Sequence, residues 1–332
     1  MTTGPSRRTA GIALDGMIPM AEMIELVRYA ERCGVRSAWM AEHMGYRDAV
    51  GASMAFLAAT RSLTVVPTAV SVYSRHPMIA AMTAATLEEC APGRTLFSVA
   101  SGNPRALGEI GLAVTQPVVV TREYVRAMRE LFTGASVTLD GSVFRLKDAR
   151  LHVVPARPLP VYVAAMGPRM LELAGEIGDG VVLSAALSPT YIRHCLGLVA
   201  AGARRAARDP ATVVAAGLVL TAVSTDGYTA RAEVKKMLAY LFRNRFIAEN
   251  LEMTGTRVDR QAAADAAARG DWATAIALVP DDAVAQYAVA GTPAECPAQL
   301  ERFRAAGLTE PVLLALGDAE ARRLAVELAG AA

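Results

Sequence analysis

The chain has 332 residues, a length that suits either two average domains or one large α/β barrel. Its 34 Lys and Arg residues against 32 Asp and Glu residues give a formal net charge of +2, which provides no basic footprint for nucleic acid. No apolar run approaches the ~18 consecutive residues that a membrane helix needs, so we expect neither a nucleic-acid nor a membrane partner.

Short apolar runs alternate with segments of helical periodicity along the whole chain. Eight runs are predicted to be parallel strands, at residues 10–14, 37–41, 63–70, 94–100, 161–165, 181–183, 212–223 and 311–316. Helices are predicted between them, at residues 19–33, about 52–61, 77–91, about 121–132, 168–177, 188–208 and 319–329. Because no linker separates two halves, this alternation favours one α/β domain over residues 1–332, a (β/α)₈ TIM barrel.

Two insertions interrupt the barrel pattern. Asp140-Gly141 stands between two β-rich runs and predicts a hairpin near residues 135–150. A second, helical insertion is predicted near residues 228–290, within a helical region that extends to about 306. Thr292-Pro-Ala-Glu295 in that region has the spacing of a capping box.

The segment Val161–Ser184 predicts a compact βαβ unit. The glycine turn at Gly167 follows a buried strand, and Pro168 suits the first position of the next helix. Free N–H groups and the positive end of the helix dipole at such a turn can bind a phosphate. The same geometry also fits an ordinary tight βα loop, so both interpretations stay open.

Residues that end the strands of such a barrel lie at the active-site mouth. They are Asp15, Glu42-His43, Ser71 to His76, Ser101 to Asn103, Met166 to Arg169, and Ser184. Many are small, few are carboxylates, and no metal-ligand spacing occurs among them. This composition would let a flat ring approach the backbone and supply the chemistry, with the protein supplying orientation.

At these residues the chain resembles the luciferase-like flavin and deazaflavin oxidoreductases. Within that family it is most similar to the coenzyme F420-dependent methylenetetrahydromethanopterin reductases. Five segments in order carry the likeness: Tyr73–Pro77, Gly167–Leu171, Ala174–Val181, Gly270–Val279 and Ala290–Pro293. The resemblance covers nearly the whole chain and implies a barrel that binds F420, or alternatively FMN, at the carboxyl ends of its strands.

The resemblance also implies the cofactor-binding residues. The ring would lie at Ala69, Val70, Ser71, Ser101, Gly102 and Asn103, and the phosphate at Ala165, Met166, Gly167, Pro168, Arg169 and Ser184. A non-proline cis peptide is expected between Thr68 and Ser71. His43 matches a histidine beside the ring and is the expected catalytic proton donor, because histidine transfers protons near neutral pH.

Two positions depart from the pattern of those reductases. Ala13 stands where they carry an acidic residue in the first strand, and Asn103 stands where they carry an aspartate. Both changes remove a carboxylate near the ring, which affects the expected substrate more than the expected cofactor.

Three functions fit these observations. The first is an F420-dependent oxidoreductase that transfers hydride between the deazaflavin and a C=C or C=N bond of a small organic substrate. The second is an FMN-dependent two-component monooxygenase. The third is a non-catalytic flavin- or deazaflavin-binding protein, motivated by Ala13 and Asn103. The family resemblance further implies a homo-oligomer.

The remaining motifs favour structural roles. His76 is expected to cap the following helix, and Trp39 and Trp272 to lie in the core. Cys33, Cys90, Cys195 and Cys296 are far apart in sequence and are expected to be buried free thiols. With no apolar segment behind the N-terminal arginines, these features predict a cytoplasmic protein.

Overall fold

The computed structural model describes residues 10–242, 244 and 247–332. The expectation of no N-terminal signal concerns residues outside these ranges. Within the described chain, one parallel sheet contains β1 (Gly11–Leu14), β2 (Ser37–Ala41), β3 (Thr64–Thr68), β4 (Val70–Ser71), β5 (Phe97–Ala100), β8 (Val161–Ala164), β9 (Gly180–Leu183), β10 (Val214–Val223), β11 (Ala288–Gly291) and β12 (Glu310–Ala315).

The sheet curls into a barrel. Its strand order is β3-β2-β1-β12-β10-β9-β8-β5-β4, and an isolated parallel bridge between Val65 and Thr95 joins β3 to the segment before β5. Since β3 and β4 share one place beside β5, the path has eight positions, as the sequence predicts. The (β/α)₈ fold is therefore confirmed.

Strand three is broken at Ala69. The Thr68–Ala69 peptide is cis, which confirms the expected non-proline cis bond between Thr68 and Ser71. Val65 is opposite Thr95 while Val70 is opposite Val99, so β3–β4 holds one more residue than its partner over this stretch. This extra residue is a bulge that turns Ala69 out of the regular ladder.

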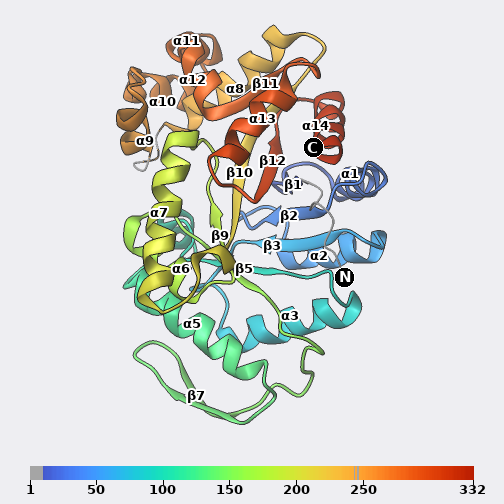
Figure 1. The fold of residues 1–332 in the computed structure, drawn as a ribbon, viewed down its shortest axis with the longest axis vertical. Coiled ribbons are helices and arrows are strands. Elements are labelled where there is room, and N and C mark those ends of the chain that lie inside the picture. The colour runs from blue at the N-terminus through green and yellow to red at the C-terminus, as the bar shows by residue number, and fades with distance from the viewer. Residues whose placement is uncertain (1–9, 243, 245–246) are drawn as a thin grey trace.

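Helices cover the outside of the barrel (Figure 1). They are α1 (Met20–Arg32), α2 (Ala49–Ala59), α3 (Pro77–Cys90), α4 (Pro104–Glu109), α5 (Pro117–Leu131), α6 (Pro168–Ile177), α7 (Pro189–Arg205), α13 (Cys296–Ala305) and α14 (Ala319–Ala331). A 3-10 turn, Pro210–Thr212, precedes β10. Two of the α-helices begin as predicted. Pro168 is the first residue of α6. His76 caps α3, because its Nδ1 accepts a hydrogen bond from the Met78 N–H at 3.2 Å.

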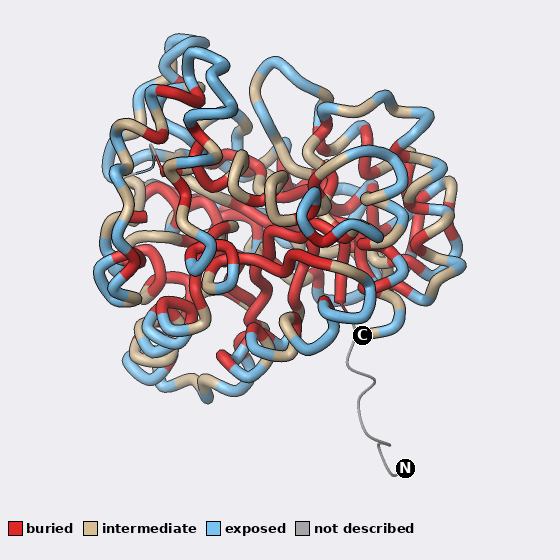
Figure 2. The backbone as a smooth tube through the Cα atoms, turned by 90° about the horizontal axis from the view of Figure 1, so that it is seen from above, coloured by how far each residue is buried: buried red, intermediate tan, exposed pale blue. Residues whose placement is uncertain are grey.

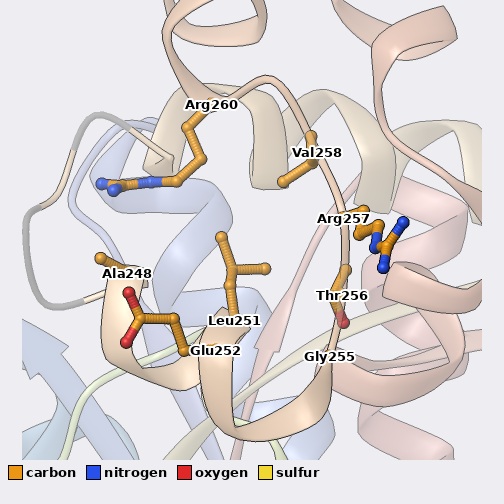
Figure 3. Close-up of a pocket in the computed structure, with 8 residues that line it drawn as sticks. All are labelled: Ala248, Leu251, Glu252, Gly255, Thr256, Arg257, Val258 and Arg260. Atoms are coloured by element: carbon orange, nitrogen blue, oxygen red, sulfur yellow. The ribbon is translucent and has the colours of Figure 1, made fainter.

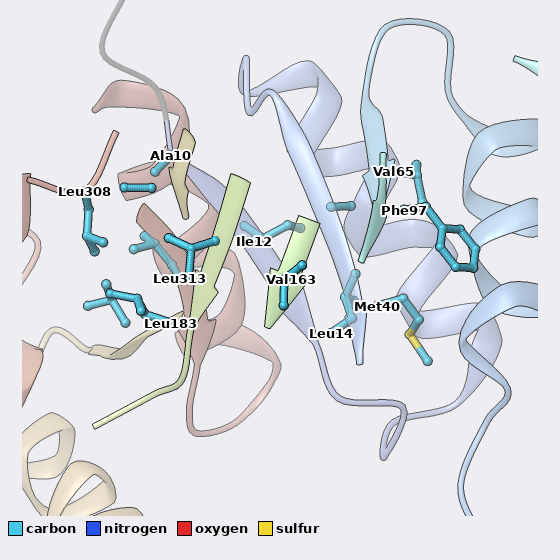
Figure 4. Close-up of a cluster of buried hydrophobic side chains, with 14 of the residues drawn as sticks. Ala10, Ile12, Leu14, Met40, Val65, Phe97, Val163, Leu183, Leu308 and Leu313 are labelled. Carbon is cyan, nitrogen blue, oxygen red and sulfur yellow. The ribbon is translucent and has the colours of Figure 1, made fainter. Parts of the chain in front are cut away.

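The apolar core has two layers. Outward-facing strand residues such as Ile12, Leu14, Val163 and Leu313 pack against the helices (Figure 4). Trp39, Val66, Tyr162, Val182, Ala216 and Val312 fill the inside of the barrel. Figure 2 shows this buried centre surrounded by exposed helices and loops. The barrel is thus a packed core, and only its mouth is available to ligands.

The hairpin is β6 (Val137–Asp140) and β7 (Arg145–Ala149), which lies at the bottom of Figure 1. Its loop is longer than the predicted Asp140-Gly141 turn, because the Gly141 N–H bonds the Phe144 carbonyl. The Glu123 carboxylate of α5 holds this loop by accepting hydrogen bonds from Ser142, Val143 and Phe144.

The helical insertion contains α8 (Gly227–Leu241), α9 (Ile247–Thr254), α10 (Arg260–Ala268), α11 (Trp272–Leu278) and α12 (Asp281–Tyr287). These helices gather above the barrel at the top of Figure 1 and form a small core of their own. The predicted helical region of about residues 228–306 is helical except at β11, which pairs with the last four residues of β10. No helix in the described part of the chain is long and apolar enough to cross a membrane.

Candidate functional site

The mouth of the barrel has a floor of small side chains. Strand alternation directs Ala13, Ala41, Thr68, Ala100 and Ala164 inward at the carboxyl ends of β1, β2, β3, β5 and β8. The four alanines are partly accessible, as is Ala69 at the bulge, while Trp39 and Tyr162 are buried one layer deeper. A flat ring could rest on this floor without displacing any large side chain.

Two buried hydroxyl groups lie near the floor, Thr68 at its level and Ser98 one layer deeper, opposite Tyr162. Thr68 and Ser98 face the inside of the barrel, and their Oγ1 and Oγ atoms have no hydrogen-bond partner among the described residues. Continuing the Val65–Thr95 register by three residues places them opposite each other. Because buried polar atoms are nearly always paired, these hydroxyls fit the polar edge of a bound group or a water molecule. Neither residue was predicted from the sequence to belong to the site, although each is a polar residue within an apolar strand.

Four neighbouring strands bring most of the predicted cofactor residues together. Ser71 is opposite Ala100, β8 follows β5, and Ala164 is opposite Val182. The residues that continue these strands, Ser101, Ala165 to Arg169 and Ser184, therefore lie side by side along the rim. Val70 and Ala165 are exceptions, since their side chains are buried toward the helices and can offer only backbone groups.

The loop between β8 and α6 forms the N-terminus of a helix without a side-chain cap. Gly167 is the cap residue, and Pro168 and Arg169 are exposed. Arg169 forms no ion pair with any other residue that the structure describes, so its guanidinium is available to a ligand. An uncapped N-terminus with a neighbouring arginine suits an oxyanion.

A buried amide fixes the loop that follows Ser184. Asn250 of α9 donates from Nδ2 to the Ala186 carbonyl at 2.8 Å and accepts on Oδ1 from the Ser188 hydroxyl at 2.7 Å. Ala186 has φ of +62°, a conformation that needs such support in a residue other than glycine. The helical insertion thus holds the rim of the predicted phosphate site.

Ser71 and Gly102 lie against each other at the ends of β4 and β5. A Cβ on Gly102 would come 2.9 Å from the Ser71 Oγ, and the φ of Gly102 is +76°, so only glycine fits well. Asn103 caps α4 by accepting a hydrogen bond from the Arg105 N–H at 3.0 Å. Asn103 therefore has a structural role besides the predicted one.

His43 lies at the end of β2, beside the bulge. The Glu42 N–H donates to the Thr68 carbonyl at 2.9 Å, which ties the two strand ends together. The His43 side chain is exposed and meets the Tyr46 ring edge-on, with centroids 6.4 Å apart. No other described residue forms a hydrogen bond with its imidazole, so both nitrogens are open to a ligand.

Glu42 points away from His43, into the layer behind the strands. Burial raises the pKa of Glu42, while the charge of Arg75 and the Ser71 N–H oppose the shift. Its Oε2 is buried without a partner in the described chain. Arg75 pairs with Asp48 at 3.2 Å and Arg47 donates to the Gly16 carbonyl at 2.7 Å, so both arginines stabilise loops.

Two hollows occur near the insertion. One, of about 460 Å³, lies over α9 and the loop after it and is lined by residues such as Glu252 and Arg257 (Figure 3). Arg260 there donates to the Phe242 and Asn244 carbonyls, which is a structural role. The other, of about 450 Å³, opens at the ends of β1 and β12 under α8 and α11 and includes Ala13 and Asp15. It adjoins the floor and is the more relevant to catalysis.

The cysteines differ from expectation in part. Cys195 and Cys296 are buried free thiols as predicted, but Cys33 is only half-buried and Cys90 is exposed at the end of α3. Cys90 lies on the outer face of that helix. Its burial was predicted because cysteine is usually buried, and the sequence gives no sign of this exception.

Comparisons with known proteins follow the same line. A family model described as luciferase-like monooxygenase matches residues 2–310. The 5,10-methylenetetrahydromethanopterin reductase of Methanolobus tindarius is 28% identical over 92% of this chain and 93% of its own length. The F420-dependent hydroxymycolic acid dehydrogenase of Mycobacterium tuberculosis is 29% identical over 70% of this chain and 67% of its own. The coenzyme F420-dependent tetrahydromethanopterin reductase of Methanopyrus kandleri superposes with a TM-score of 0.87, at 24% identity and 98% coverage of both chains.

Proposed function

Because the chain belongs to the luciferase-like monooxygenase family, and because its barrel mouth has an open floor of small side chains, we propose that it is an F420-dependent oxidoreductase. The Mycobacterium tuberculosis dehydrogenase named above supports this choice of cofactor, since its name includes F420. The reaction proposed is hydride transfer to or from a C=C or C=N bond of a small organic substrate.

The residues present fit a deazaflavin. The alanine floor accepts a planar ring, and the Thr68 hydroxyl, which has no partner among the described residues, would match its polar edge. The N-terminus of α6 with Arg169, and Ser184 on the next strand, would hold the phosphate. When bound, F420 supplies or accepts a hydride. The floor orients the ring, and the insertion above it limits access of water.

His43 would hold the proton that complements the hydride. It is exposed at the rim, beside the bulge on which the ring would rest, and no neighbour in the described chain occupies its nitrogens. In a reduction it donates a proton to the substrate atom that does not receive the hydride. In the reverse direction it accepts that proton.

The first test is a titration with F420 and, separately, with FMN, followed by tryptophan fluorescence. We expect F420 to bind in the low micromolar range and FMN to bind far more weakly. A preference for FMN would replace this proposal with the two-component monooxygenase. Binding of neither would overturn it.

The second test separates binding from catalysis. With reduced F420 and a panel of small enones and imines, His43→Asn should lower turnover about 100-fold or more and leave cofactor affinity unchanged. His76→Asn, at the cap of α3, is the matched control and should retain turnover. Equal turnover in His43→Asn and the wild type would remove His43 from the mechanism, while binding without turnover on any substrate would favour a non-catalytic protein.

A further inference from the structure

The cavity of about 450 Å³ lies across the mouth from the predicted phosphate loop. Around the barrel, β8 is four positions away from β1 and three from β12, the two strands whose ends open into the cavity. A cofactor anchored at Gly167 to Arg169 would extend its ring toward the cavity. Ala13 belongs to both the floor and the cavity lining, so the two spaces adjoin at this residue.

The walls of the cavity are mainly apolar and aromatic. Met17, Met237, Leu314 and Leu316 contribute apolar surface. Tyr46, Tyr240 and Trp272 contribute aromatic rings, which come from the β2–α2 loop and from α8 and α11. The prediction that Trp272 lies in the core is wrong: the side chain is 36% exposed, and part of it faces this space. Such walls suit a planar organic molecule of the size that pockets of a few hundred Å³ hold.

The charged side chains that line the cavity differ in whether they already have a hydrogen-bond or ion-pair partner. Arg322 donates to the Gly317 carbonyl, and Asp15 accepts from the Met17 N–H. Lys236 forms no ion pair with any residue that the structure describes, and its ammonium lies 5.1 Å from the centre of the Trp272 ring. Glu233 lies one turn earlier on α8 and forms no hydrogen bond or ion pair with another part of the described chain.

A cation held over an aromatic wall can bind an anion while the wall contacts the rest of the ligand. Lys236 is half-buried, so a carboxylate there would be only partly hydrated and its attraction to the ammonium would exceed that of a fully exposed pair. Glu233 is the opposing group, because its carboxylate would repel an anion and attract a cation.

We propose that this cavity binds the substrate and selects a planar organic anion, with Lys236 meeting its carboxylate and Trp272 its planar part. The assignment rests on the proposed function, because it takes the reactive ring to lie on the adjoining floor. It adds to that function a substrate class and two residues that determine specificity.

Three probes of one shape test the proposal: 2-naphthoate, 2-naphthamide and 2-naphthylmethylammonium. Their affinities are measured by calorimetry for the protein alone and for the protein saturated with F420. We expect the naphthoate to bind at least about fivefold more tightly than the amide, and the cation to bind most weakly. Lys236→Gln should abolish the difference between the naphthoate and the amide.

Lys235→Gln is the matched control. Lys235 is the next residue of the same helix, and its ammonium pairs with Asp281 at 2.7 Å, outside the cavity lining. This variant should keep the preference for the anion. Trp272→Leu should weaken all three probes.

Equal affinities for the three probes, a preference for the cation, or an anion preference that survives Lys236→Gln would each overturn the proposal. Failure of the proposed function looks different. If neither cofactor binds but the naphthoate preference depends on Lys236, the anion site stands and the F420 assignment falls. If F420 binds and no probe is distinguished, the F420 assignment stands and the anion site falls.

Discussion

Two glutamates, Glu310 and Glu123, have pKa values shifted in opposite directions by their surroundings. Glu310 lies at the bottom of the barrel, where its Oε1 accepts a hydrogen bond from the Ser37 hydroxyl at 2.6 Å. Burial raises the pKa of Glu310, and the bonds from Ser37 and Trp39 and the charge of Arg36 only oppose this shift. For Glu123, burial also acts upward, but the hydrogen bonds from Ser142, Val143 and Phe144 outweigh it and lower the pKa to about 2.

The signs of the two effects on stability follow from these shifts. A raised pKa in the folded state means that folding is favoured by the protonated form of Glu310, so this contribution is lost as pH rises above about 4. A lowered pKa means that folding is favoured by the ionised form of Glu123, so this contribution is lost as pH falls below about 4.

Thermal unfolding of Glu310→Gln and Glu123→Gln between pH 3 and pH 8 measures both effects. The melting temperature of Glu310→Gln should rise relative to the wild type as pH increases. Glu123→Gln should melt below the wild type at neutral pH, and this gap should narrow toward pH 3. Parallel trends in the two variants would mean that the surroundings described for these carboxylates do not govern their titration.

The helices α6 and α7 approach each other closely through two glycines. A Cβ on Gly175 would overlap the Val199 carbonyl oxygen, and one on Gly202 would overlap the Glu172 carbonyl oxygen. The two backbones therefore lie against each other without intervening side chains, which fixes α6 and the uncapped N-terminus at Gly167. Because the contact needs both helices in place, it could not be predicted from the sequence of either helix.

Alanine in place of either of these glycines should lower the stability of the protein, although alanine usually stabilises a helix relative to glycine. Alanine stabilises an exposed helix position by about 0.5–1 kcal/mol, and Gly197→Ala on α7 should do so because its Cβ would meet nothing within 4 Å. Gly175→Ala should instead destabilise by about 1–3 kcal/mol or more, because the helices must separate. Chemical denaturation of both variants measures the difference. An equal gain in both would contradict the packing described.

The strands were predictable because each is a buried apolar run bounded by turn residues. Their parallel pairing follows from the helices between them. β11 was not predictable, since Ala288-Val-Ala-Gly291 lies among helices and is a strand only because the end of β10 lacks a neighbour there. The rim residues could be predicted from strand ends. The Thr68–Ser98 pair, the role of Trp272 and the Asn250 bonds could not, because they depend on register and on how the insertion folds back.

For the whole molecule, we propose that the chain associates with a second copy of itself. α2, Ala49-Val-Gly-Ala-Ser-Met-Ala-Phe-Leu-Ala-Ala59, has no charged side chain, although Gly51 and Ala58 are exposed. Ile79 and Met82 of the neighbouring α3 are 46% and 48% exposed. A helix that is apolar on every side is normally covered on every side, and a two-fold contact between identical faces would cover this one.

Light scattering of Met82→Glu tests this pairing. The wild type should be dimeric at micromolar concentration, and the charge should shift it toward the monomer, because an unpaired carboxylate in an apolar contact is costly. Tyr228→Glu, which changes a 77% exposed residue of α8, should leave the mass unchanged. A monomeric wild type, or a dimeric Met82→Glu variant, would place any association elsewhere.

The segment between β10 and β11 leaves the barrel and returns to it at neighbouring places. Leu220 to Val223 pair in register with Ala288 to Gly291, so the chain re-enters beside the strand it left. The barrel can therefore keep its strand order whatever lies between these two points. In evolution, or in a designed chimera, the helices that carry Lys236 and Trp272 are exchangeable as one unit, provided that the replacement supplies a partner for the Ala186 carbonyl in place of Asn250. A new selectivity can then be acquired while the strands of the barrel stay as they are.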